Sequence, residues 1–487
     1  MDISFLFLLF LLLPILLILH KKNSSPTQTN FTPLHPYPIL GNIPHIFKNR
    51  SRMLDWASDL IPLSPTFTST VSPFIFTANP SNIQHILHSN FDNYPKGGFV
   101  SSAMHDFLGH GIFNSNGPLW RLQRKTASFE FNTKSIRSFI FDIVLRETIQ
   151  VLIPILDHSI TTNKILDLQD LLERFAFDNI CNLAFGYNPE SLAGTSDEGL
   201  RFFHAFDEAS HIVVKRTGST IPWQIKKLLN VGSEKRFRQS QGIVNEMVSK
   251  FVRLRRKQDD LLSRFADDPS NSDELLLDIS INFMIAGRDT TPTALTWFFW
   301  ILSSRPKIVK QILAEIKSVR EKKNDNKDEF FEFEELREMH YLHAALSETM
   351  RLYPPVPLLL RVAVNDDVLP DGTGVKKGWY VMYNSYVMGR MKSLWGEDCM
   401  EVRPERWLVD GVYRPVSSYK YPVFHGGPRV CLGKEMAYIQ MKAVVACVLE
   451  RFEIEVVEER GEPQLSMTMR MKGGLPVRVK HRNNNTV

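Results

Sequence analysis

Hydrophobic residues recur at intervals of three and four positions over much of this chain, which is typical of amphipathic or buried helices. Short aromatic or β-branched runs bounded by turn residues, at 73–77 and 379–383, predict strands instead. Residues 465–479, which contain two adjacent glycines, predict a late hairpin. The sequence therefore predicts a mainly α fold with a small β portion, with long helices at 165–185, 272–302, 306–322, 341–352 and 432–451.

The first 22 residues have a different pattern. Residues 3–19 are apolar apart from Ser4 and Pro14, and a helix of about 17 residues covers a thin bilayer such as that of the endoplasmic reticulum. Basic residues follow this run instead of preceding it, which argues against a removed secretory signal, the alternative, and keeps the rest of the chain in the cytosol. We expect one transmembrane anchor at 1–22, a polar and proline-rich hinge at 23–41 and the main domain at 42–487.

Charge and cysteine content narrow the classes of protein further. There are 58 basic and 53 acidic residues, an excess that suits a membrane surface or an acidic partner but is too diffuse to indicate nucleic-acid binding. The four cysteines are too few to stabilise a chain of 487 residues through disulfides. This scarcity favours a reducing compartment and leaves each thiol open to another role.

One of these cysteines lies in a distinctive segment, Phe424-His-Gly-Gly-Pro-Arg-Val-Cys-Leu-Gly433. Cys431 directly precedes a predicted helix, so unpaired amides and the helix dipole are expected to stabilise its thiolate, aided by the charge of Arg429. Gly427 and Gly433 let a flat ring approach the backbone. A buried, inert cysteine is the alternative. The pattern F-x-x-G-x-R-x-C-x-G resembles the haem-binding loop of the cytochrome P-450 superfamily.

That resemblance gives meaning to a second motif, Ala286-Gly-Arg-Asp-Thr-Thr291, within the predicted helix 272–302. Asn282, Ala286 and Thr290 are four residues apart and share one face, and the Thr290 hydroxyl can bond back to the Ala286 carbonyl. The resemblance implies that Thr290 and Asp289 supply protons during O₂ reduction. An incidental polar stop within a helix is the alternative.

Other pairs are weak alone but occur in the order found in the superfamily. Glu348 and Arg351, three residues apart, are joined by Arg406 in what resembles a structural clamp behind the cysteine segment. Trp120 and Arg124 are implied to bind one haem propionate, Arg361 the other, and Arg429 can also reach one; Phe424 and Gly433 complete the implied cofactor site. A basic face for an acidic electron donor, or a plain solvated face, is predicted from Arg121, Lys125, Lys434 and Lys442.

The resemblance covers nearly the whole chain after the anchor and points to a branch. Residues 94–98, 108–114, 129–135, 294–300 and 434–438 resemble the plant fatty-acid ω-hydroxylases, nearest the subgroup of fatty-acid and jasmonoyl-isoleucine hydroxylases. This implies a P-450 fold with a large helical domain and a smaller β-rich domain, haem b, O₂ and electrons from an NADPH-cytochrome reductase. It also implies an endoplasmic reticulum enzyme that hydroxylates a terminal or near-terminal C–H bond of a lipid-like substrate.

Three leucines, 358–360, stand where relatives often have polar residues, so a bulkier lipid such as a sterol side chain is an alternative substrate. A peroxide-using haem-thiolate isomerase or dehydratase and a non-catalytic haem protein are the alternative functions. For the substrate pocket we expect seven residues, each of which could instead be ordinary core: Phe107, Ile112, Phe113, Ala286, Val356, Leu359 and Met467.

Overall fold

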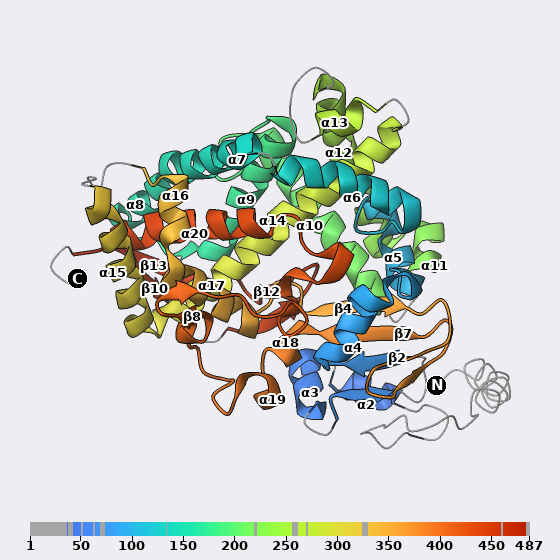
Figure 1. Cartoon of the computed structure of the whole chain (residues 1–487). Helices are drawn as coiled ribbons and strands as arrows, with labels where there is room; N and C mark the ends of the chain where they lie inside the picture. The colour runs from blue at the N-terminus through green and yellow to red at the C-terminus, as the bar shows by residue number, and fades with distance from the viewer. Residues whose placement is uncertain are drawn as a thin grey trace, which may run out of the picture. The chain divides into compact units, whose positions relative to one another are not determined.

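The computed structural model describes residues 37, 42–49, 52–61, 64–68, 74–132, 134–218, 222–255, 262–268, 271–323, 330–458 and 461–483 (Figure 1). Within those ranges no helix is both long enough and apolar enough to cross a bilayer. The predicted anchor, residues 1–22, lies outside the described residues, and of the predicted hinge only Tyr37 is described. The described chain is mostly helical with short strands, which confirms the predicted class.

The chain divides into two compact units. The first, here the sheet unit, comprises Met1–Lys96, Leu358–Met400 and Ser417–Val430. Its four-stranded sheet has the order β1-β2-β7-β4, with β2 and β7 parallel and the outer pairs antiparallel. The strands are β1 Thr66–Thr68, β2 Phe74–Thr77, β4 Leu358–Val362 and β7 Tyr380–Asn384, accompanied by β5 Asp367–Val368, β6 Gly374–Val375, α2 Ile43–Lys48, α3 Met53–Leu60, α4 Pro80–Gln84, α18 Ser385–Met388 and α19 Lys392–Trp395.

The second unit, here the helical unit, comprises Gly97–Pro357, Glu401–Val416 and Cys431–Val487. Its strands form small sheets, β10-β13-β3, β11-β12 and β8-β9. The helices are α5 Gly98–Leu108, α6 Gly117–Asn132, α7 Lys134–Glu147, α8 Ile153–Thr161, α9 Leu168–Phe185, α10 Asp197–Lys215, α11 Trp223–Leu229, α12 Gly232–Arg255, α13 Ser263–Ala266, α14 Asp273–Ser303, α15 Pro306–Lys323, α16 Phe333–Glu338, α17 His340–Leu352 and α20 Lys434–Arg451; the strands are β3 Leu166–Asp167, β8 Leu408–Val409, β9 Val412–Tyr413, β10 Phe452–Val456, β11 Pro463–Leu465, β12 Met469–Met471 and β13 Pro476–His481.

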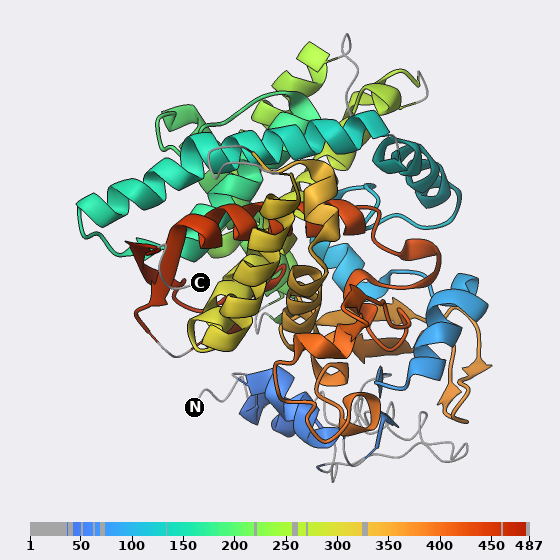
Figure 2. The same ribbon diagram turned by 60° about the vertical axis from the view of Figure 1, so that its left-hand side comes forward.

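Helix α14 is the central element of the helical unit. The Ser272 side chain caps its first turn by accepting from the Leu275 N–H, and two acidic residues follow the cap, as the helix dipole favours. Most of its residues are buried, and it packs against α9 along much of its length (Figure 2). Phenylalanines of α9 and α10 form a large part of the adjoining core, among them Phe177, Phe202 and Phe206. Such a buried helix presents its side chains in fixed positions.

The predicted elements compare closely with the observed ones, with one error. Each predicted long helix is present, but α9 begins only after β3, because the Asp167 carboxylate caps its N-terminus. The predicted hairpin at 465–479 is wrong. The actual hairpin pairs β11 with β12, and Gly473-Gly474 instead lead into β13, which pairs with β10 from a different part of the sequence. Both glycines have φ of +82°, so they turn the chain without forming the hairpin's tip.

Candidate functional site

The cysteine segment ends where α20 begins. Protein atoms surround Cys431 on most sides, although part of its side chain stays accessible, and Gly433 occupies the N-cap position of the helix. Gly427, earlier in the segment, has φ of +62°, and a Cβ there would lie 1.9 Å from the Leu87 carbonyl oxygen within the sheet unit. Only glycine fits this position, so the close backbone approach expected at Gly427 is present.

Burial and the neighbouring polar groups act on the Cys431 thiol in opposite directions. A hydrogen bond from the Gly433 N–H and the charges of Arg124 and Lys434 favour the thiolate, but burial outweighs them and raises the pKa of Cys431. The Gly433 N–H supplies the kind of amide stabilisation expected at the helix terminus, but burial has the larger effect on the pKa. Binding to a metal deprotonates a thiol outright, so the site fits a thiolate–iron bond.

Two predicted propionate-binding residues lie one turn apart on α6. Trp120 is buried and Arg124 half-buried. Burial lowers the pKa of Arg124, whereas the negative charge of Cys431 would raise it. Arg124 therefore lies close enough to Cys431 to interact with a group bound there.

A cluster of three cations occupies the sheet unit. Burial and the charges of Arg429 and Arg361 hold the pKa of Lys96 well below its usual range. Arg361, on β4, is almost fully buried; its Nη1 donates to the Leu360 carbonyl, and its Nε and Nη2 make no hydrogen bond. Buried donors of this kind call for an anion. The residues present therefore fit an anionic group such as a haem propionate.

Sequence reasoning missed Lys96 as a member of this cluster. In the sequence, Lys96 belongs to the segment Tyr94-Pro95-Lys96, which indicated only the family branch and not a cofactor contact. The Val362 N–H donates to the Pro95 carbonyl at 3.1 Å, which holds this segment beside β4. This backbone pairing brings Lys96 near Arg361, and it could not be predicted because the two segments are far apart in the sequence.

On α14 the structure shows the predicted local geometry. The Thr290 hydroxyl donates to the Ala286 carbonyl at 2.8 Å, four residues earlier. Asp289 is buried; its Oδ1 accepts from Arg288 Nη1 at 2.6 Å, and its Oδ2 has no hydrogen-bond partner. Burial raises the pKa of Asp289, although the Arg288 charge opposes this effect. A hydroxyl and a protonatable carboxyl therefore occupy consecutive positions of one helix, each with a different hydrogen-bond partner.

The three residues of the predicted clamp come together within the helical unit. Glu348 accepts from Arg351 Nε at 2.8 Å and from Arg406 Nε at 3.2 Å. The Trp407 indole N–H donates to the same carboxylate at 3.0 Å, a contact that the sequence analysis did not anticipate. Glu348 and Arg351 are fully buried, so the network is structural.

The seven residues expected to line the substrate pocket differ in burial and in the unit to which they belong. Phe107 belongs to the core, where its ring meets those of Phe206 and Phe237 edge-on. The other six are half-buried, with Leu359 in the sheet unit and the remainder in the helical unit: Ile112, Phe113, Ala286, Val356, Leu359 and Met467. They remain candidates.

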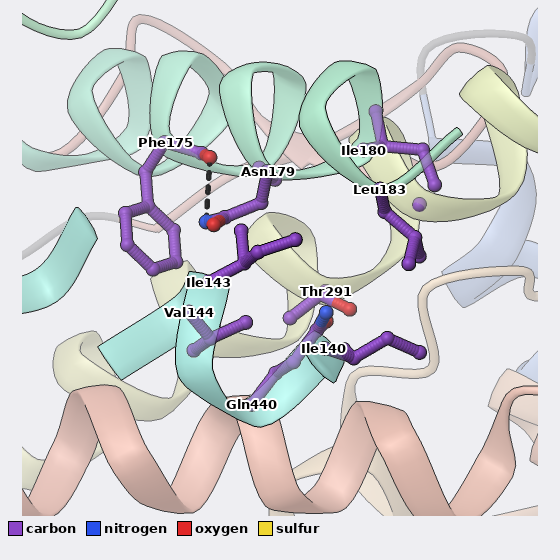
Figure 3. Close-up of a pocket in the computed structure, with 11 residues that line it drawn as sticks. Ile140, Ile143, Val144, Phe175, Asn179, Ile180, Leu183, Thr291 and Gln440 are labelled. Carbon is purple, nitrogen blue, oxygen red and sulfur yellow. Dashed lines mark hydrogen bonds between the residues drawn. The ribbon is translucent and has the colours of Figure 1, made fainter. Parts of the chain in front are cut away.

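A small cavity lies on another side of α14, among α7, α9 and α20 (Figure 3). Its volume of about 20 Å³ suits a single water molecule. Asn179, Thr291 and Gln440 bring polar groups to an otherwise apolar wall, and Asn179 Oδ1 has no hydrogen-bond partner in the structure. Its lining residues differ from those predicted for the substrate pocket, and its volume is too small for a lipid-like substrate.

The predicted basic face loses one member. Arg121 and Lys125 are exposed and Lys434 is half-buried, but Lys442 is buried and its Nζ donates to the Leu336 carbonyl at 2.8 Å. Burial lowers the pKa of Lys442 to about 8. Including Lys442 in a docking face was therefore wrong, because its side chain points into the fold.

Comparison with known proteins agrees with this geometry. The Cytochrome P450 family model matches residues 32–480. Cytochrome P450 CYP94D108 of Paris polyphylla is 48% identical over 453 residues, 91% of each chain. Cytochrome P450 94A1 of Vicia sativa is 46% identical over 92% of this chain and 90% of its own, and cytochrome P450 94B1 of Arabidopsis thaliana is 43% identical over 94% of each. The predicted family is confirmed: this chain belongs to the cytochrome P450 monooxygenases.

Proposed function

We propose that this protein hydroxylates a terminal or near-terminal C–H bond of a fatty acid or of jasmonoyl-isoleucine, using O₂ and electrons from an NADPH-dependent reductase. The observation that carries the monooxygenase chemistry is the Thr290 hydroxyl bonded back to the Ala286 carbonyl on α14, directly after the buried Asp289 in the chain. The substrate class rests on five segments that resemble plant fatty-acid ω-hydroxylases, supported by plant relatives over most of the chain. A membrane anchor at 1–22 and residence in the endoplasmic reticulum belong to the same proposal.

The proposed haem contacts follow from the donors present. Cys431 ligates the iron, with the Gly433 N–H as a donor to its sulfur. Trp120 and Arg124 would bind one propionate. Arg361 and Arg429, together with Lys96, form the cationic cluster of the sheet unit and would bind negative charge of the haem. Phe424 lies in the cysteine segment three residues before Gly427. Bound haem supplies the activation of O₂ that no side chain can perform.

The protein's own part in the reaction is to move protons and exclude water. The Thr290 hydroxyl donates to the Ala286 carbonyl, which fixes its orientation and leaves the oxygen lone pairs to accept a hydrogen bond from a water or another donor. Burial raises the pKa of the Asp289 carboxyl, the direction that favours a role as general acid. The two residues would therefore pass protons toward the reaction in sequence.

The test is a product analysis with matched cysteine variants. Microsomes that contain the protein and a reductase would receive NADPH and a panel of fatty acids, jasmonoyl-isoleucine and sterols, with products identified by mass spectrometry. We expect hydroxylated fatty acid or jasmonoyl-isoleucine. Products from sterols alone would support the alternative substrate, and peroxide turnover without NADPH would support the isomerase.

Cys431→Ser should abolish both the product and the reduced-CO spectrum of a thiolate-bound haem. Cys399→Ser is the control, because the buried Cys399 thiol donates to the Arg390 carbonyl at 3.1 Å, a bond that a hydroxyl can replace. A normal CO spectrum in Cys431→Ser would contradict the proposed ligand.

A further inference from the structure

A chain of charged side chains runs from Asp289 across four elements of the helical unit. Arg288 on α14 donates to Asp289 Oδ1 at 2.6 Å and to Asp207 Oδ1 of α10 at 2.7 Å. Arg470 on β12 also donates to Asp207, at 3.0 Å, and bonds Glu173 of α9. Three carboxylates thus share two guanidinium groups. Only Asp289 has so far been given a role.

The network runs from the buried Asp289 and Arg288 to the partly solvent-exposed Asp207. The Arg288 side chain is 1% exposed, and the rings of Phe203 and Phe206 lie 4.9 and 5.6 Å from its guanidinium carbon. Asp289 is 8% exposed, whereas the Asp207 side chain is 35% exposed. Water therefore reaches Asp207 on α10, and the buried Arg288 side chain lies between Asp207 and the protonatable oxygen of Asp289.

The hydrogen bonds determine where a proton can be held. Arg288 divides its donors between two carboxylates, so it neutralises neither completely. Asp289 Oδ1 is occupied by Arg288, and Asp289 Oδ2 is buried without a hydrogen-bond partner. An excess of negative charge in a poorly solvated network favours proton uptake. Oδ2 is the oxygen of Asp289 that remains available for it.

We propose that Arg288 and Asp207 are positioning residues that together set the protonation of Asp289, and that α10 thereby takes part in the proton supply of the reaction. Arg288 orients the carboxyl so that Oδ2 carries the proton. Asp207, held by Arg470, draws part of the Arg288 charge away from Asp289. This inference rests on the proposed role of Asp289 and extends it to a second helix.

The other groups around the network leave this assignment intact. Burial lowers the pKa of His211 on α10 and raises the pKa of the Cys181 thiol on α9, so both are uncharged near pH 7. Glu208 on α10 pairs with Arg236 at 2.9 Å on the exposed surface. The charged groups bonded into the network are Asp207 of α10, Glu173 of α9 and Arg470 of β12. Farther carboxylates also act nearby: Asp178 on Cys181, and Asp167 and Asp170 on Arg470.

Two substitutions should act in opposite directions. Arg288→Gln removes the cation and should move the titration of Asp289 to higher pH by about one unit or more. Asp207→Asn removes the competing carboxylate, leaves Arg288 to Asp289 alone, and should move the titration to lower pH. Arg288→Lys retains the charge and should restore most of the original midpoint. A merely structural role would produce no such opposition of sign.

The measurement is an infrared titration of the resting ferric protein, in which the protonated carboxyl band of Asp289 is assigned by its loss in Asp289→Asn. Glu334→Gln is the control, because Glu334 pairs with Arg337 at 3.1 Å on the exposed surface of the same unit and outside this network. Opposite shifts, with Glu334→Gln unchanged, support the proposal. Unchanged midpoints, or shifts of the same sign in both variants, overturn it.

The same variants separate this inference from the proposed function. If the infrared midpoints shift as expected, the pH profile of product formed per NADPH consumed should shift with them in the reconstituted enzyme. Shifted midpoints in a protein that forms no product from NADPH and O₂ would leave the network established and refute the monooxygenase role. Product formation with unmoved midpoints would refute the network alone.

Discussion

Two buried carboxylates of the helical unit, Glu348 and Asp289, have opposite surroundings. Glu348 receives hydrogen bonds from Arg351, Arg406, the Trp407 indole and the Arg403 backbone, so each oxygen has several donors. Asp289 shares one arginine with another carboxylate and keeps an oxygen without a partner. Both oxygens of Glu348 are therefore engaged in structural hydrogen bonds, whereas Oδ2 of Asp289 can still bind and release a proton. The same residue class thus serves folding in one place and chemistry in the other.

The largest effect should follow from Glu348→Gln. The change leaves Arg351 buried without a full countercharge, a loss that typically costs about 3–5 kcal/mol. We expect the free energy of urea unfolding to fall by that amount, together with a loss of bound haem. The control is Glu334→Gln, whose partner Arg337 is 63% exposed, where we expect no measurable change. Equal stability of the two variants would contradict the structural role of Glu348.

A smaller effect, on chemistry and not on stability, should follow from Thr290→Ala. We expect normal haem content but product per NADPH lowered by about 10- to 100-fold, because the hydroxyl that passes the proton is gone. Thr296→Ala is the matched control, since the buried Thr296 hydroxyl likewise donates to the carbonyl four residues earlier, that of Pro292, at 2.8 Å. NADPH consumption and product would be measured together. Unchanged coupling in Thr290→Ala would remove Thr290 from the proton path.

The sequence predicted what depends on local spacing. The Thr290–Ala286 bond follows from a separation of four residues on a helix, and the Glu348–Arg351 pair from a separation of three. The position of Cys431 before α20 likewise follows from one short segment. Each of these relations lies within a few helical turns, where helix geometry alone determines the neighbours.

Contacts between distant segments could not be predicted in this way. Asp207 lies 81 residues before Arg288, and nothing in either helix marks the other as its partner. Lys442 looked like surface because lysines usually are, but the packing of α20 against α16 buries it. Strand β13 pairs with β10 instead of closing a hairpin. In each case tertiary packing decided between options that local propensity left equal.

A third carboxylate, Glu147 at the end of α7, has no cation among the described groups that act on its pKa. The amide of Asn188 lies 3.5 Å away, while burial and the charges of Asp178 and Glu190 raise the pKa of Glu147 to about 7. Between its ordinary pKa of 4.5 and this value, the folded protein holds the proton more tightly than the unfolded chain does. The resulting stabilisation is complete below the ordinary pKa and is lost as the pH rises through about 7.

Glu147→Gln should therefore alter stability in a way that depends on pH. At pH 8 the native protein carries an ionised, poorly compensated Glu147, so the neutral variant should be more stable by about 1–3 kcal/mol. At pH 5 the carboxyl is protonated in the folded protein and the difference should nearly vanish. Urea unfolding at the two pH values measures both. An equal gain in stability at pH 5 and pH 8 would show that Glu147 is ionised across this range, and would contradict the raised pKa.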